Sequence, residues 1–252
     1  MKKDLFRVVM VVLVTLGTIT VNILANALPI NGLNTGQISD RFQTYFVPAG
    51  YVFSIWGLIY IGLLAHAVFQ ALPAQRANPR LQATGWWVVL GGLANSLWIF
   101  LWHYEQFPAT LAAMLVLLAS LIAVYLRLGT GRSQVSAAET WTVRVPFSIY
   151  LGWISVATVA NASDVLDFLA WNQFNLSDGI WMIALLAVVV LLAGLMNYQR
   201  RDIAYTAVLL WALAGIGVKF PANGIVTIAI WIAFGLVALS LAGAFLLKRK
   251  TA

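Results

Sequence analysis

The chain has 252 residues, of which 62% are hydrophobic and only 9% are charged, with a formal net charge of +7 and no cysteine. A soluble domain carries about 25% charged residues, so this composition excludes a soluble catalytic domain and favours an integral membrane protein, whose lipid-facing surface is apolar. The lack of cysteine also excludes disulfides, thiolate metal sites and cysteine nucleophiles.

Eight apolar runs follow one another along the chain, each about long enough to cross a bilayer. We expect them to be helices, because an open strand would leave its backbone groups unpaired in lipid. The runs comprise residues 7–29, 48–73, 84–104, 108–129, 145–163, 179–197, 203–220 and 223–247. The predicted fold class is all-α, a polytopic transmembrane helical bundle of eight helices.

Basic residues are distributed unevenly between the two sides that eight spans define. Of the 15 Lys and Arg residues, all but Arg41 and Lys219 lie on the side of the N-terminus. Because cytoplasmic loops are enriched in Lys and Arg, both termini are predicted to be cytoplasmic, in a multi-pass protein of the inner (plasma) membrane. The basic groups are short and lie at the ends of apolar runs, which indicates contact with membrane lipid rather than with nucleic acid.

The first run has an alternative interpretation as a signal peptide. Residues 1–27 have a basic start, an apolar stretch and an Ala25-Asn26-Ala27 end, and their cleavage would leave seven helices. The length of the apolar stretch and the polar Asn22 and Asn26 favour a helix that is retained.

The connection over residues 164–178 carries apolar and aromatic residues between acidic ones. Val165, Phe168 and Trp171 within it predict a short interfacial helix. Asp164 and Asp167 are interpreted as part of a solvated outer face.

Polar and aromatic residues share one face in three of the eight helices, because they recur at helical spacing. The stripes consist of Phe53, Trp56 and Tyr60; of Asn95, Trp98 and Trp102; and of Tyr150, Trp153, Ala157, Thr158 and Asn161. With Asn22 and Asn26 of the first run, they predict a pocket with aromatic walls and a few amide donors, suited to a flat, largely apolar ligand. The alternative is packing, in which amides hydrogen-bond between helices and aromatic rings fill gaps.

Three other residues, His66, His103 and Lys219, are of types that bind haem or retinal, but their positions in the sequence do not support such roles. His66 and His103 lie about 20 Å apart in depth, too far to share one haem iron. Lys219 is next to Phe220-Pro221 at a helix end, where its amine reaches the interface without a retinal partner. The apolar runs contain no paired carboxylates, so no metal site and no catalytic residue is predicted.

Three segments resemble motifs of the tryptophan-rich sensory protein and translocator protein (TspO) family. Residues 47–60, VPAGYVFSIWGLIY, resemble its second-helix motif, which begins with prolines and continues to a Trp and an aromatic residue. Residues 95–98, NSLW, are similar to its Asn-x-x-Trp on the third helix. Residues 150–161 resemble its fifth-helix Tyr-x-x-Trp motif with a following Ala-Thr-x-x-Asn. The segments occur in the family's order and lie within residues 5–165. The first loop departs from the family pattern, because residues 42–46, FQTYF, stand where the family has Trp-Tyr and Lys-Pro-x-Trp.

The resemblance implies a five-helix ligand-binding core over residues 1–165 and a three-helix membrane extension over residues 166–252. Family members bind porphyrins and haem, so the resemblance implies a tetrapyrrole or similar planar lipophilic ligand that is sensed or transported. It also implies that no cofactor is required and that the protein forms a homodimer. Two alternatives stay open: a small-solute transporter, and an enzyme that degrades porphyrin in light. The expected ligand-binding residues are Asn22, Asn26, Pro48, Phe53, Trp56, Tyr60, Asn95, Trp98, Trp102, Tyr150, Trp153, Ala157 and Asn161.

Overall fold

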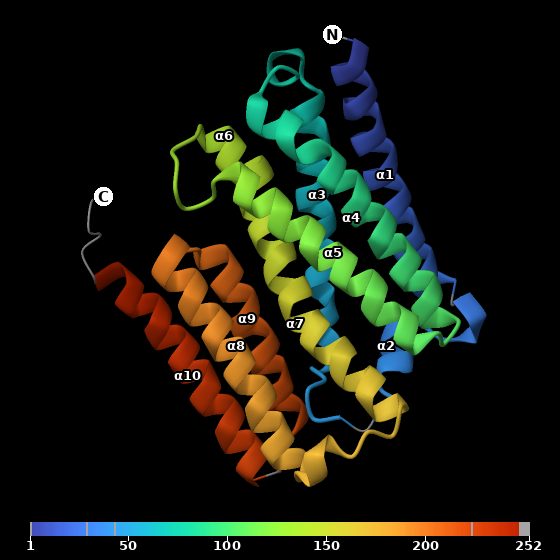
Figure 1. Ribbon diagram of the computed structural model, residues 1–252, viewed down its shortest axis with the longest axis vertical. Coiled ribbons are helices and arrows are strands. Elements are labelled where there is room, and N and C mark those ends of the chain that lie inside the picture. The colour runs from blue at the N-terminus through green and yellow to red at the C-terminus, as the bar shows by residue number, and fades with distance from the viewer. Residues whose placement is uncertain (1, 29, 43, 223, 247–252) are drawn as a thin grey trace.

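The computed structural model describes residues 2–28, 30–42, 44–222 and 224–246, and all regular structure within them is helical (Figure 1). Eight long helices are present: α1 (Lys2–Ala27), α3 (Ile55–Ala71), α4 (Pro79–His103), α5 (Phe107–Leu128), α7 (Val145–Phe168), α8 (Asp178–Arg200), α9 (Ile203–Lys219) and α10 (Gly224–Leu246). The short elements are η1 (Ile30–Gly32), α2 (Thr35–Ser39), η2 (Gly50–Ser54), η3 (Pro73–Gln75), α6 (Ala137–Glu139), the π-helical turn η4 (Thr140–Arg144) and η5 (Gln173–Asn175).

The predicted fold class, a polytopic helical bundle, is confirmed. Seven of the described helical segments are long and apolar enough to cross a membrane, and α9, with 17 residues, is a shorter apolar helix. At 1.5 Å per residue α9 extends about 25 Å, close to the thickness of the hydrocarbon core. Large side chains such as Leu191 and Leu239 are exposed on the outside of the bundle, where lipid would surround them.

The fifth apolar run forms a longer helical segment than predicted. It begins at Ala137, passes through the π-helical turn before Pro146 and continues to Phe168. The expected interfacial helix after residue 164 is therefore wrong: Val165 and Phe168 belong to the last turns of α7, and only the turn η5 follows. Because α7 continues past this point, Asp164, which was interpreted as solvated, is buried within the bundle and accepts a hydrogen bond from Thr44.

Five of the helices form a closed ring. Following helix contacts around it, α1 packs on α4, α4 on α5, α5 on α7, α7 on α3, and α3 on α1 (Figure 1). Small residues permit the close approaches: a Cβ added at Gly62 of α3 would lie 2.8 Å from Cβ of Pro146, at the start of α7. Such packing of small residues is typical of helices in membranes.

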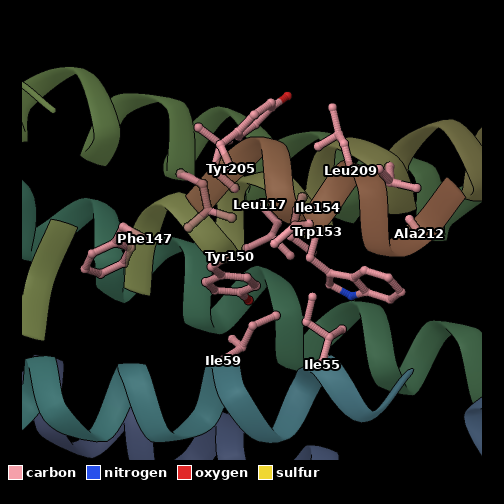
Figure 2. Close-up of a cluster of buried hydrophobic side chains, with 14 of the residues drawn as sticks. Ile55, Ile59, Leu117, Phe147, Tyr150, Trp153, Ile154, Tyr205, Leu209 and Ala212 are labelled. Carbon is pink, nitrogen blue, oxygen red and sulfur yellow. The ribbon is translucent and has the colours of Figure 1, made fainter. Parts of the chain in front are cut away.

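The three C-terminal helices lie against one side of this ring, and α9 makes the main contact. It packs along α7, while α10 packs on both α8 and α9. Figure 2 shows Tyr205 and Leu209 of α9 on the face of α7 opposite to Ile55 and Ile59 of α3. The approach is close, since a Cβ added at Gly152 of α7 would lie 2.9 Å from the Tyr205 carbonyl oxygen.

A buried polar junction joins the start of α9 to the ring. Asp202 accepts hydrogen bonds from the hydroxyls of Tyr125 in α5 (2.8 Å) and Ser148 in α7 (2.6 Å), and from the backbone N–H of Tyr205 (3.0 Å). One carboxylate therefore caps α9 and ties it to two other helices. Nearby, Asn197 of α8 accepts from Thr206 and donates to Ser240 of α10, which links the three C-terminal helices to one another.

The bundle has two ends, which we name by the position of α1. The proximal end contains the start of α1, the α8–α9 turn and the end of α10, and the distal end contains α2 and the α4–α5 turn (Figure 1). The start of α1 and the end of α10 lie at the same end because the eight long helices alternate in direction.

We predict that the proximal end faces the cytoplasm, because it carries most of the basic residues. Reporter fusions after Arg80, Arg132 and Arg201 and at the C-terminus are expected to report cytoplasm, and a fusion at Asn172 is expected to report the outside. A C-terminal fusion that reports the outside would contradict eight crossings.

Candidate ligand-binding site

A cavity of about 70 Å³ lies inside the ring, toward the distal end. We call it the inner cavity. Aromatic rings of α3, α4 and α7 form most of its wall, α5 adds apolar side chains, and α2 lies across the distal side. Its lining consists of Thr35, Ser39, Val47, Pro48, Phe53, Trp56, Asn95, Trp98, Trp102, Met114, Leu117, Trp153, Ile154, Val156, Ala157, Ala160, Asn161 and Asp164.

A wider hollow of about 690 Å³ lies between α1, α2, α3 and α4. We call it the outer groove. Four residues, Thr35, Phe53, Trp56 and Trp98, line both hollows, so the groove and the inner cavity meet at these side chains. Its volume falls in the range of small-molecule sites, about 300–1,000 Å³. Its remaining lining is Asn22, Ile23, Asn26, Ala27, Asn34, Gly36, Gln37, Asp40, Gly50, Tyr60 and Ile99.

The aromatic side chains form two groups across the cavity. On the α3 side, Trp56 stacks on Tyr60 with ring centroids 5.7 Å apart, and it meets Trp153 of α7 nearly at right angles at 6.3 Å. On the α4 side, Trp98 stacks on Trp102 at 5.1 Å, with only 18° between the ring planes. The inner cavity is therefore bordered by stacked aromatic pairs of two different helices, whose apolar ring surface suits a planar ligand.

The amides that the sequence suggested as ligand donors are engaged within the protein. Asn95 accepts from Asn22 (2.7 Å) and donates to the hydroxyl of Tyr150 (3.1 Å), which joins α1, α4 and α7. Asn161 accepts from the Trp98 indole (3.2 Å) and donates to Thr110 of α5 (2.9 Å). These amides therefore hold the helices together and orient the Trp98 ring, because both ends of each amide have a protein partner.

Two polar groups on the cavity wall are less well satisfied. Trp153 is only 3% exposed, and its indole N–H has no hydrogen-bond partner within the described structure. Asp164 is also 3% exposed, and its single hydrogen bond among the described residues comes from the Thr44 hydroxyl at 3.3 Å. Buried polar groups normally have partners, so these two are the groups that a bound molecule would satisfy.

The described residues 30–42, which include α2, cover the distal side of the cavity, and we call this segment the lid. Hydrogen bonds with His103, at the end of α4, hold the lid in place. The His103 ring contacts the Ile30 carbonyl (3.0 Å) and the Thr35 hydroxyl (3.1 Å), and the Trp102 indole donates to the Thr35 carbonyl (3.2 Å). A surface ion pair of 2.8 Å between Lys219 and Asp40 links the lid to α9. His66 lies elsewhere, packed edge-on against Phe147, so the two histidines have separate structural roles.

The structure brings twelve of the thirteen expected site residues onto the walls of the two hollows. Nine of them line the inner cavity, and Asn22, Asn26 and Tyr60 line the outer groove alone. Tyr150 differs: it lies behind Trp56, its ring 5.8 Å from the indole, and lines neither hollow. Its hydroxyl reaches Asn95 instead, so it supports the wall from outside.

Several lining residues were not expected from the sequence, among them Thr35 and Ser39 of α2, two residues of α5, and Asp164. Met114 and Leu117 of α5 line the inner cavity, although α5 carries no polar or aromatic stripe. Asp164 was interpreted as solvated, and this is wrong because α7 places it on the cavity wall. A signal for Asp164 was present, since it continues the stripe of Ala157 and Asn161 at helical spacing.

A family model described as TSPO-like protein matches residues 8–243 of the chain. The match extends from α1 into α10, beyond the region that the three sequence motifs cover. Comparisons with curated proteins and with solved structures give no match.

Proposed function

The chain belongs to the TSPO-like protein family, and from this premise we propose that it binds a tetrapyrrole, such as a porphyrin or haem, or a similar planar lipophilic molecule, for sensing or transport in the inner (plasma) membrane. It is a multi-pass membrane protein of the TspO type. The observation that carries the proposal is the pair of stacked aromatic walls around an inner cavity that joins a wider groove.

The shape and the polarity of the two hollows both support this proposal. A planar conjugated ring gains apolar burial and favourable ring contacts between indoles, each aromatic pair contributing about 0.5–1.5 kcal/mol beyond its buried area. The outer groove has the larger volume and is lined by the amides of Asn26, Asn34 and Gln37. A ligand whose ring enters between the indoles therefore has polar partners for its outer edge in the groove.

The described residues that line the two hollows all come from residues 22–164. Helices α8 to α10 therefore have an indirect role in this proposal: α9 supports the wall of the cavity from outside. The outer groove lies next to α1 and α3, which offers a lipophilic ligand an approach from the membrane.

The test is saturable quenching of tryptophan fluorescence by protoporphyrin or haem, because Trp56, Trp98 and Trp153 would lie beside the bound ring. We expect Trp153→Leu to weaken binding several-fold, since it removes the ring that faces both Trp56 and Phe53. Circular dichroism of the variant verifies that it is folded.

Trp231→Leu is the matched control, because Trp231 lies on α10 and is 46% exposed. Its affinity is expected to equal that of the unmodified protein. Equal weakening by both substitutions would indicate nonspecific partitioning and contradict the proposed site. The same samples, followed by absorbance under illumination, also test the enzymatic alternative, which requires a changed product spectrum.

A further inference from the structure

The charged residues that line the two hollows are both acidic. Neither lining contains a Lys, an Arg or a His within the described structure, whereas Asp164 lines the inner cavity and Asp40 the outer groove. A ligand carboxylate that enters the inner cavity would therefore meet no cation in its lining. A ligand that enters with a proton donor would meet a carboxylate.

Asp164 is the acidic group that is available for such a contact. It is buried on the wall, and the weak 3.3 Å bond from Thr44 engages only Oδ1. The Lys219 amine interacts with it electrostatically, but its 2.8 Å ion pair is with Asp40. Asp167, one turn further along α7, is exposed and has the same sign of charge.

The two amides and the Thr35 hydroxyl on the wall of the inner cavity have protein partners, and the Trp153 indole N–H, which has none within the described structure, is a donor. The Asn95 and Asn161 amides bond to Asn22, Tyr150, Trp98 and Thr110, and the Thr35 hydroxyl bonds to His103. Asp164 is thus the strongest acceptor left for a ligand. A buried carboxylate without a counter-ion is unfavourable, and a bound cation or N–H donor relieves that cost.

We propose that the two joined hollows select planar aromatic ligands whose leading edge enters the inner cavity and presents a nitrogen-borne proton donor, most strongly a protonated nitrogen, to Asp164, and reject those that present a carboxylate there. The aromatic walls bind the ring, and Asp164 determines which edge of the ring enters first. Carboxylate substituents of a larger ligand stay in the outer groove, next to the amides of Asn26, Asn34 and Gln37. This inference rests on the proposed function and names the ligand class.

The test compares two probes with the same ring and opposite charge, 9-aminoacridine as a cation and acridine-9-carboxylate as an anion. Their affinities are measured by fluorescence on the full-length protein in an uncharged maltoside detergent. We expect the unmodified protein to bind the cation at least about tenfold more tightly, the scale of one hydrogen bond to a charged group. An equal affinity for the two probes would overturn the inference without any variant.

Asp164→Asn keeps the size of the side chain and removes its charge. The variant is expected to bind 9-aminoacridine about tenfold more weakly and to lose the preference for the cation. Asp167→Asn is the matched control, on the same helix but exposed, and its preference is expected to be unchanged. A preference that survives in Asp164→Asn, or that disappears equally in Asp167→Asn, contradicts a role for Asp164.

Protoporphyrin quenching on the same variants separates this inference from the proposed function. If porphyrin binds but the acridine preference is absent, the proposed function stands and the role of Asp164 fails. If the acridine preference depends on Asp164 but porphyrin does not quench, the cavity binds planar cations and the tetrapyrrole proposal fails.

Discussion

Replacing Asp202 by Ala is expected to lower the free energy of unfolding by about 3–7 kcal/mol. The change removes the cap of α9, which costs about 1 kcal/mol. It also leaves the hydroxyls of Tyr125 and Ser148 without their acceptor inside the bundle, at about 1–3 kcal/mol each. Unfolding in detergent, followed by circular dichroism with increasing denaturant, measures the loss.

Two further variants determine whether the junction causes this loss. Asp202→Asn keeps one acceptor oxygen, which serves either the helix cap or the two hydroxyls, so we expect it to recover only part of the lost stability. Asp178→Ala removes an exposed acidic residue from the first turn of α8 and is expected to change the stability by less than about 0.5 kcal/mol. If Asp178→Ala destabilised the protein as much as Asp202→Ala, the buried junction would not be the reason.

The second large effect is expected at Gly215, where α9 touches the wall of the inner cavity from outside. A Cβ there would lie 2.1 Å from Cγ2 of Val52 and 3.5 Å from Cβ of Pro48. The backbone around η2 is tied to α9, because Ala49 N–H donates to the Gly215 carbonyl (3.2 Å) and the Trp211 indole donates to the Val52 carbonyl (3.1 Å).

Gly215→Leu should therefore displace η2 and, with it, Pro48 and Phe53, which line the inner cavity. We expect porphyrin affinity to fall by at least about tenfold, which is 1.4 kcal/mol, and stability to fall by about 1–3 kcal/mol from overpacking. Tryptophan quenching and thermal unfolding measure the two effects.

Gly235→Leu on α10 is the matched control, since a Cβ there meets nothing within 4 Å. It gains the same helix propensity, so we expect unchanged binding and equal or slightly higher stability. Binding that is unaffected in Gly215→Leu would mean that α9 does not support the cavity wall, and the C-terminal helices would then be independent of the site.

The sequence by itself determined the class and arrangement of the helices. Apolar runs of membrane-spanning length in a chain with 9% charge leave few alternatives, because only helices and closed barrels satisfy their backbone in lipid. The aromatic stripes also indicated correctly which faces of α3, α4 and α7 meet, since helical spacing determines which side chains share a face. The family motifs were recognisable for the same reason: each lies within one helix.

Only the tertiary structure decided what each polar group contacts. Asn95 and Asn161 looked like ligand donors, but partners 51 to 73 residues away engage them. Asp164 looked solvated, but the continuation of α7 and the Thr44 hydroxyl bury it. Hydrogen-bond partners depend on which helices lie side by side, and spacing within one helix carries no information on that.

The sequence also does not indicate which residues of the apolar helices α5 and α9 contribute to the site. Met114 and Leu117 line the cavity, and Gly215 supports its wall, yet none differs in type from residues that face lipid. In a soluble protein, hydrophobicity distinguishes the core from the surface. Here lipid is as apolar as the interior, so only the packing of the helices reveals which apolar side chains face the ligand site.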